Sequence, residues 1–138
     1  MKKILIAICL VLPLLVCCDI YQNPIPYVKL DFFVYPNDVM YHQLNTYGGY
    51  VYVTGGVNGI IIYRLDEWTF FAYDRACPHD FENHDSWLWV APDGLRLVDS
   101  LCGSTYNILD GSVLSGPSQY PARKYNTRYD GVRLRVYS

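Results

Sequence analysis

Two short segments of the sequence carry side chains that can bind a metal ion or form a disulfide. The first is Cys-Pro-His at positions 77–79, and the second is Asp-Ser-Leu-Cys-Gly-Ser at positions 99–104. Thiolate, imidazole and carboxylate groups all bind metals. Cys77 and Cys102 are the only cysteines beyond residue 18. In an oxidising compartment, such an isolated pair forms either metal ligands or a disulfide.

The elements that must position these donors are predicted to be β-strands. Short runs rich in Val, Ile, Tyr, Phe and Trp are typical of strands. They lie at residues 28–35, 49–54, 60–65, 69–73, 87–91, 95–98, 106–109, 124–129 and 132–137. Turn-forming pairs such as Asp110-Gly111 and Asp130-Gly131 separate several of them. Only residues 37–45, with Asp38 near their start, suggest a helical turn, so the sequence predicts an all-β sandwich or barrel.

In order and spacing, these segments resemble the Rieske family of iron–sulfur proteins. In that family a Cys-x-His loop and a Cys-x-x-His-Gly-Ser loop hold a [2Fe–2S] cluster, with two Cys on one iron and two His on the other. Residues 77–79 match the first loop, Gly103-Ser104-x-Tyr106 matches the end of the second, and residues 110–117 resemble the family's proline loop. The resemblance extends from about residue 48 to the C-terminus. It implies a Rieske-like antiparallel β-sandwich with the cluster-binding loops at one tip.

The second loop departs from the family pattern at both of its ligand positions. With Gly103-Ser104 as the anchor, the family's second Cys falls on Asp99 and its second His falls on Cys102. The ligand set that the resemblance implies is therefore Cys77, His79, Asp99 and Cys102. Cys77 and Asp99 would hold one iron, and His79 and Cys102 the other. Replacing an imidazole by a thiolate is expected to lower the reduction potential below the high Rieske range.

Two residues beside the second loop are implied to tune the cluster. By resemblance, Ser104 donates a hydrogen bond to a bridging sulfide and Tyr106 donates one to a cysteine sulfur. Hydrogen bonds of this kind disperse negative charge and raise the potential. A shift in the alignment would instead recruit Asp80 or His84, although neither matches a ligand position of the family.

Two other chemistries remain open for the same residues. In a Rieske fold without its cluster, a disulfide between Cys77 and Cys102 would close a loop of 26 residues. Such a bridge stabilises a domain by about 3 kcal/mol. It makes no demand on position 99, which accounts for an Asp where the cluster needs a Cys. A mononuclear metal site, such as a zinc site, is the third possibility.

The N-terminal residues 1–17 are typical of a bacterial lipoprotein signal peptide. Lysines at positions 2 and 3 precede an apolar run of 13 residues, which suits a signal peptide and is too short to span a bilayer. The run ends in Leu-Val-Cys-Cys at 15–18, which resembles a lipobox and predicts acylation of Cys18. Plain secretion is the alternative. Residues 18–27 are expected to form a tether, residues 28–138 the domain, and the protein a membrane-anchored component of the bacterial cell envelope.

The charge and the motifs narrow the class of function. Residues 18–138 carry a net charge of about −4, which argues against binding to nucleic acid. We find no Ser-His-Asp set, paired-carboxylate cleft or phosphate-binding glycine loop. The resemblance implies a one-electron carrier that meets a redox protein partner at the membrane surface and has no substrate pocket of its own. A cluster-free envelope lipoprotein with a binding or scaffold role, or a small subunit of a larger oxidoreductase, are the alternatives.

Overall fold

The computed structural model describes residues 22–138, and nearly all of its regular structure is β-strand. The strands are β1 (Asp31–Val34), β2 (Tyr50–Val53), β3 (Ile60–Arg64), β4 (Phe70–Asp74), β5 (Leu88–Val90), β6 (Arg96–Asp99), β7 (Thr105–Asn107), β8 (Val113–Ser115), β9 (Lys124–Tyr129) and β10 (Leu134–Tyr137). All nine predicted strands are present. The tenth, β8, lies within the segment that resembles the family's proline loop.

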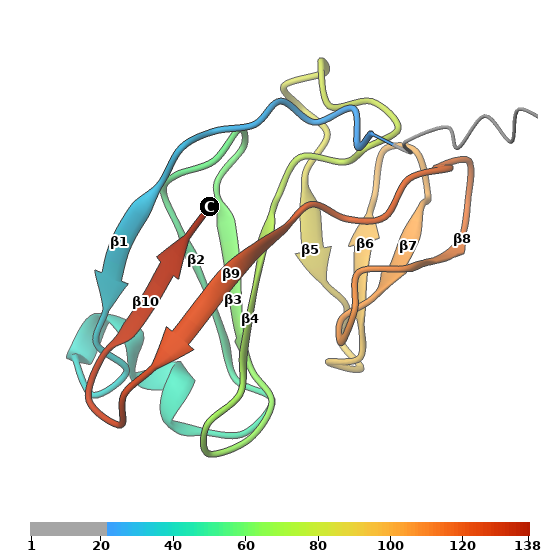
Figure 1. The fold of residues 1–138 in the computed structure, drawn as a ribbon. Helices are drawn as coiled ribbons and strands as arrows, with labels where there is room; N and C mark the ends of the chain where they lie inside the picture. The colour runs from blue at the N-terminus through green and yellow to red at the C-terminus, as the bar shows by residue number, and fades with distance from the viewer. Residues whose placement is uncertain (1–21) are drawn as a thin grey trace, which may run out of the picture.

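The strands form two antiparallel sheets (Figure 1). The larger sheet has the order β1-β10-β9-β4-β3-β2, and the smaller one has the order β5-β6-β7-β8. Along the chain, the smaller sheet is inserted between β4 and β9, which pair with each other in the larger sheet. The loop from β4 to β5 therefore connects the two sheets, whereas the loop from β6 to β7 lies within the smaller sheet. The predicted all-β, antiparallel architecture is confirmed.

The predicted helical turn is a short 3-10 helix, η1 (Val39–Asn45). Asp38 caps it, since its side chain accepts a hydrogen bond from the backbone N–H of Met40 at 3.0 Å. A short polar side chain at this position satisfies a backbone donor that the helix leaves without a partner. Within residues 22–138, no helix has the length and apolar character that crossing a membrane requires.

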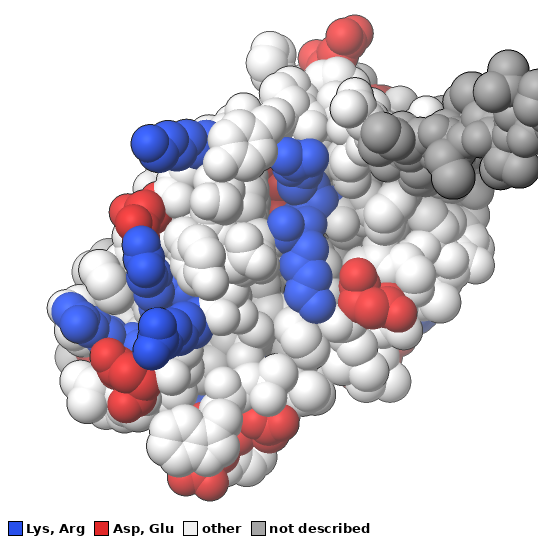
Figure 2. Space-filling view, in the orientation of Figure 1, with Lys and Arg blue, Asp and Glu red and all other residues white. Residues whose placement is uncertain are grey.

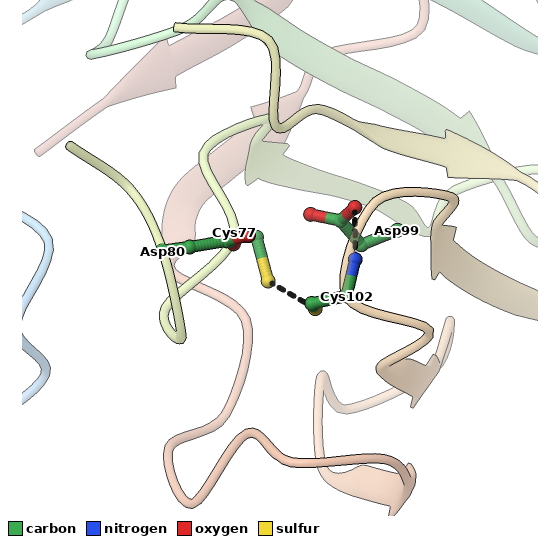
Figure 3. Close-up of side chains that lie close together, drawn as sticks. All are labelled: Cys77, Asp80, Asp99 and Cys102. Atoms are coloured by element: carbon green, nitrogen blue, oxygen red, sulfur yellow. Dashed lines mark hydrogen bonds between the residues drawn. The ribbon is translucent and has the colours of Figure 1, made fainter. Parts of the chain in front are cut away.

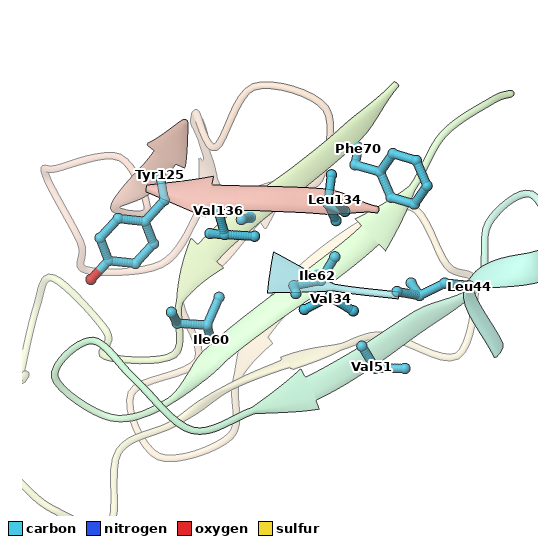
Figure 4. Close-up of a cluster of buried hydrophobic side chains, with 10 residues drawn as sticks. Val34, Leu44, Val51, Ile60, Ile62, Phe70, Tyr125, Leu134 and Val136 are labelled. Atoms are coloured by element: carbon cyan, nitrogen blue, oxygen red, sulfur yellow. The ribbon is translucent and has the colours of Figure 1, made fainter. Parts of the chain in front are cut away.

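Strand β3 contributes to two separate hydrophobic cores, which explains its uninterrupted apolar sequence. Ile60 and Ile62 face the core of the larger sheet, drawn in Figure 4, together with residues of β4, β9 and β10. Ile61 and Tyr63 point the other way, into a second core built mainly on the smaller sheet. Alternate residues of a strand face opposite sides. Cys77 and Tyr106 belong to the second core, so the candidate site is built on its edge.

Part of the predicted tether packs onto the domain. Ile25 is buried with 1% of its surface exposed. The side-chain amide of Asn23 donates a hydrogen bond to the backbone carbonyl of Pro121 at 2.7 Å. Contacts with the domain therefore begin before residue 28. The predicted signal peptide, residues 1–17, and the predicted lipidation site, Cys18, lie outside the described residues.

Candidate metal centre

The β4–β5 loop and the β6–β7 turn lie at one end of the fold (Figure 1). They bring the cysteines of the two segments together (Figure 3). Cys77 follows β4 by three residues, and Cys102 lies in the turn between β6 and β7. Their Sγ atoms are 3.6 Å apart, and both thiols are free. Cys77 is fully buried, whereas Cys102 is partly exposed. The pair thus forms a site that is closed on the protein side and reachable from the solvent.

Three of the four predicted ligands converge, and the fourth converging donor is Asp80. One ligand atom from each of Cys77, Asp80, Asp99 and Cys102 lies within 4.8 Å of every other. His79 is exposed and does not belong to this group. A turn explains the difference, because the backbone N–H of Asp80 donates to the carbonyl of Cys77 at 3.2 Å. This turn returns Asp80 to the vicinity of Cys77. His84 is exposed in the following loop.

Asp99 organises the loop that carries Cys102. Its Oδ1 atom accepts hydrogen bonds from the backbone N–H groups of Leu101 at 2.6 Å and Cys102 at 3.3 Å. Its backbone carbonyl accepts a third from Gly103 at 3.0 Å. Aspartate commonly holds a turn by bonding to backbone N–H groups two or three residues ahead. Asp99 therefore holds the turn that carries Cys102 and is also one of the four converging donors.

The buried thiol of Cys77 lies against the hydroxyl of Tyr106. The Cys77 Sγ and Tyr106 Oη atoms are 3.3 Å apart, and both side chains are fully buried. Burial raises the pKa of the Cys77 thiol well above its ordinary value, and the contact with Tyr106 opposes this only in part. Without a bound cation the thiol is therefore protonated at neutral pH. A metal ion would be needed to hold it as a thiolate.

Ser104 links Cys102 to a third segment of the chain. The Cys102 thiol donates to the Ser104 hydroxyl oxygen at 3.1 Å, and the backbone N–H of Ser104 donates to Cys102 Sγ at 3.4 Å. The same hydroxyl oxygen accepts a hydrogen bond from the backbone N–H of Ser118 at 3.1 Å. The loop after β8 thus closes over the Cys102 loop. Ser104 contacts a cysteine sulfur in this arrangement.

Ser86 is part of the site although no sequence pattern indicated it. Its hydroxyl lies 2.6 Å from Asp80 Oδ1 and also contacts Asp99 Oδ2. The side chain is fully buried at the end of the β4–β5 loop. Only the path of that loop brings residue 86 back to residues 80 and 99, so the contact depends on tertiary structure. Ser86 thereby joins the two carboxylates of the donor group.

We expect Tyr106→Phe to lower the free energy of unfolding by about 1 kcal/mol, because it removes one hydrogen bond and keeps the buried ring. Urea denaturation followed by tryptophan fluorescence measures the change. Tyr35→Phe is the matched control, since the Tyr35 side chain is 46% exposed. Equal and negligible losses in both variants would mean that the contact between Tyr106 and Cys77 contributes no stability.

Comparisons with known proteins find likeness in structure only. No family model and no curated protein matches the sequence. The ferredoxin of carbazole 1,9a-dioxygenase from Nocardioides aromaticivorans IC177 superposes with a TM-score of 0.51 and 16% identity, over 69% of this chain and 91% of that one. A chain from the complex of reduced oxygenase and oxidized ferredoxin in carbazole 1,9a-dioxygenase gives 0.50 and 20%, over 67% and 82%. This likeness confirms the predicted Rieske-like fold.

Proposed function

We propose that this chain is an electron-transfer module that holds an iron–sulfur centre between residues 76–80 and 99–104. The observation that carries the proposal is the convergence of two cysteine sulfurs and the Asp99 carboxylate at one end of a Rieske-like fold. Cysteine thiolates are the principal protein ligands of iron–sulfur clusters. Similarity to a ferredoxin, and to a complex of a ferredoxin with its oxygenase, supports a role in delivering electrons to a partner protein.

The residues fit a [2Fe–2S] cluster in part. In the arrangement expected from the sequence, Cys77 and Asp99 hold one iron, and Cys102 and His79 hold the other. Cys77, Asp99 and Cys102 lie together, but His79 lies outside the group. Cys102 is partly exposed, which gives the site a route to a docked partner. When bound, the cluster would supply one-electron chemistry, while Tyr106 and Ser104 contact the cysteine sulfurs.

We also propose that Cys18 carries a lipid anchor that holds the module at a membrane of the bacterial cell envelope. The support comes from the sequence at residues 15–18 and from the short chain between Cys18 and the packed residues 23–25. A tether this short keeps the domain near the lipid surface, where a membrane-bound redox partner can reach it. Replacing Cys18 by Ser is expected to release the protein from the membrane fraction.

The metal content of the full-length chain tests the cluster. After anaerobic purification we expect about two irons and two acid-labile sulfides per chain. Asp99→Cys restores the family's ligand type and is expected to improve retention of the cluster. Asp99→Asn keeps an oxygen that can hold the turn but removes the charged ligand, so it is expected to lower the content. A chain without iron in every variant would contradict the cluster.

A cluster-free protein with a disulfide is the second candidate, and the 3.6 Å separation of the two sulfurs favours it. A disulfide needs about 2.05 Å between the sulfurs, so a small movement of the Cys102 loop would suffice. The bridge would stabilise the domain by about 3 kcal/mol and leave the lipoprotein a binding or scaffold role. Thiol titration under denaturing conditions before and after reduction distinguishes this candidate, because only a bridged chain gains two thiols.

A further inference from the structure

We propose that Cys77, Cys102, Asp80 and Asp99 form a site for a single tetrahedral divalent transition-metal ion. The inference rests on the proposed function in one respect, namely that a metal is bound between the same two loops. It differs in replacing the two-iron cluster by one ion and in giving Asp80 the ligand position that the family pattern assigns to His79. This inference follows from the difference between the expected donor group, which contains His79, and the observed one, which contains Asp80.

The separation of the two sulfurs fits a single ion. Two thiolates that bind one tetrahedral ion at about 2.3 Å lie about 3.8 Å apart. The Cys77 and Cys102 sulfurs are 3.6 Å apart, and all four donor atoms lie within 4.8 Å of one another. In the two-iron assignment Cys77 and Cys102 bind different irons, so the whole cluster core would lie between their sulfurs. The observed group is narrower than that arrangement requires, so a cluster would need the two loops to move apart, whereas a single ion fits the group as it stands.

The hydrogen bonds of Ser86 are a second observation that points to a cation. The Ser86 hydroxyl contacts an oxygen of Asp80 and an oxygen of Asp99, yet it has one hydrogen to donate. The hydroxyl can therefore donate to only one of the two carboxyl groups at a time. None of the ion pairs within residues 22–138 involves Asp80 or Asp99. Two carboxyl groups held together at a buried serine, without a basic partner, are placed to share a bound cation.

Hydrogen-bonding groups of the protein lie directly against three of the four donors. Two backbone N–H groups bond to Asp99 Oδ1, which leaves Asp99 Oδ2 facing Ser86 and the site. Because the Ser104 oxygen already accepts from Ser118, its own hydrogen is available to donate to a Cys102 thiolate. The Tyr106 hydroxyl is placed to do the same for Cys77. Such outer hydrogen bonds orient metal ligands and strengthen binding.

An ion can enter from the solvent through the acidic β4–β5 loop. Asp80 and Cys102 are partly exposed, while Cys77 and Asp99 are fully buried. The loop also carries the exposed side chains of Glu82 and Asp85. Figure 2 shows acidic side chains at this upper end of the molecule, whereas many of the basic ones gather over β1, β10 and β9. Negative charge at the entrance raises the local concentration of cations.

The donor types restrict the ion to the borderline transition metals. Two thiolates exclude Mg²⁺ and Ca²⁺, which prefer oxygen ligands alone, and a tetrahedral group suits Zn²⁺ or thiolate-bound iron. Ferrous iron would preserve a role in electron transfer, because it can change its oxidation state. Zinc has no redox chemistry, so zinc would make the centre structural. The two ions share one coordination chemistry. Metal analysis of the purified protein distinguishes between them.

Metal titration of the full-length chain tests the site. The reduced, chelator-treated protein is titrated anaerobically with Co²⁺, which reports tetrahedral thiolate ligation through its visible absorption, and Zn²⁺ is then added as a competitor. We expect one Co²⁺ per chain, with thiolate charge-transfer bands, displaced by one Zn²⁺. Asp80→Asn is expected to weaken Zn²⁺ binding by at least about tenfold. Asp66→Asn, the same change at an exposed residue between β3 and β4, is the matched control and is expected to leave the affinity unchanged. His79→Gln separates the two ligand assignments, because only the cluster assignment makes His79 a ligand. Circular dichroism verifies that all three variants are folded.

The outcomes separate this inference from the proposed function. One ion per chain without acid-labile sulfide, lost in Asp80→Asn and kept in His79→Gln, supports the single-ion site. If that ion is iron in the protein as purified, electron transfer is supported as well, and if it is zinc, electron transfer is contradicted. Two irons with two sulfides, lost in His79→Gln and kept in Asp80→Asn, overturn the single-ion site and support the cluster. A reduced chain that binds no Co²⁺ overturns the single-ion site, and a chain that also lacks iron and sulfide as purified overturns the cluster.

Discussion

Asp74→Ala is expected to remove at least about 4 kcal/mol of stability, because four hydrogen-bond donors would lose their acceptor at about 1–3 kcal/mol each. Asp74 ends β4 and is fully buried. Its carboxylate accepts from the N–H groups of Val57, Asn58 and Ala76 and from the hydroxyl of Tyr125. Domains of this size are stable by about 5–15 kcal/mol in total, so the variant is expected to be largely unfolded at moderate urea.

Asp66→Ala is the matched control for Asp74→Ala. The Asp66 side chain also accepts hydrogen bonds from two backbone N–H groups, those of Trp68 and Thr69, both at 2.8 Å. Asp66 is exposed, however, and water can replace the lost acceptor. We expect a loss of about 1 kcal/mol or less. Urea denaturation of the full-length chain measures both variants, and equal losses would refute the importance of burial at Asp74.

The effect of Asp74→Ala is also expected to reach the candidate metal centre. The hydrogen bond from the Ala76 N–H to Asp74 Oδ1, at 2.8 Å, fixes the backbone immediately before Cys77. Without it, the start of the β4–β5 loop is no longer held to β4. The milder variant Asp74→Asn keeps one acceptor oxygen, so it is expected to stay folded and to bind Co²⁺ more weakly than the wild-type chain.

Gly116→Ala is expected to have the second largest effect, on the candidate metal centre. The added Cβ would clash with the backbone of the loop that carries Cys102. Gly116 has a φ of +96°, and a Cβ atom there would lie 2.4 Å from Ser104 Cα and 2.8 Å from Ser104 N. Neither atom belongs to a side chain that could rotate away. The loop after β8 must therefore move outward, which breaks the hydrogen bond from Ser118 to Ser104. We expect Co²⁺ affinity to fall by more than about tenfold.

Gly94→Ala separates the clash from backbone strain. Gly94 also has a positive φ, +69°, but no atom lies within 4 Å of the position of an added Cβ. Strain alone is expected to cost about 1–2 kcal/mol and to leave the affinity for Co²⁺ unchanged. Thermal unfolding and Co²⁺ titration are measured for both variants. Loss of affinity in Gly94→Ala to the same extent would show that the close approach of Gly116 to Ser104 is unimportant.

Patterns over a few neighbouring residues were enough to predict most of the strands. Runs such as Ile60-Ile61-Ile62-Tyr63 are β-branched and aromatic, and Asp130-Gly131 marks a tight turn, so local preference and tertiary structure agree there. Strand β8 escaped prediction because it has three residues, of which Leu114 and Ser115 are exposed. Without a buried face, it shows no alternation that the sequence could reveal.

The sequence by itself determined the all-β class, the two loops that carry the cysteines, and the departure of Asp99 and Cys102 from the family's ligand types. The tertiary structure alone decided which donors meet. A turn joins Cys77 to Asp80 rather than to His79, and the β4–β5 loop returns Ser86 to the two carboxylates. Strand preferences depend on neighbouring residues, whereas a metal centre depends on the paths of loops between distant strands. Only packing of the whole chain sets those paths.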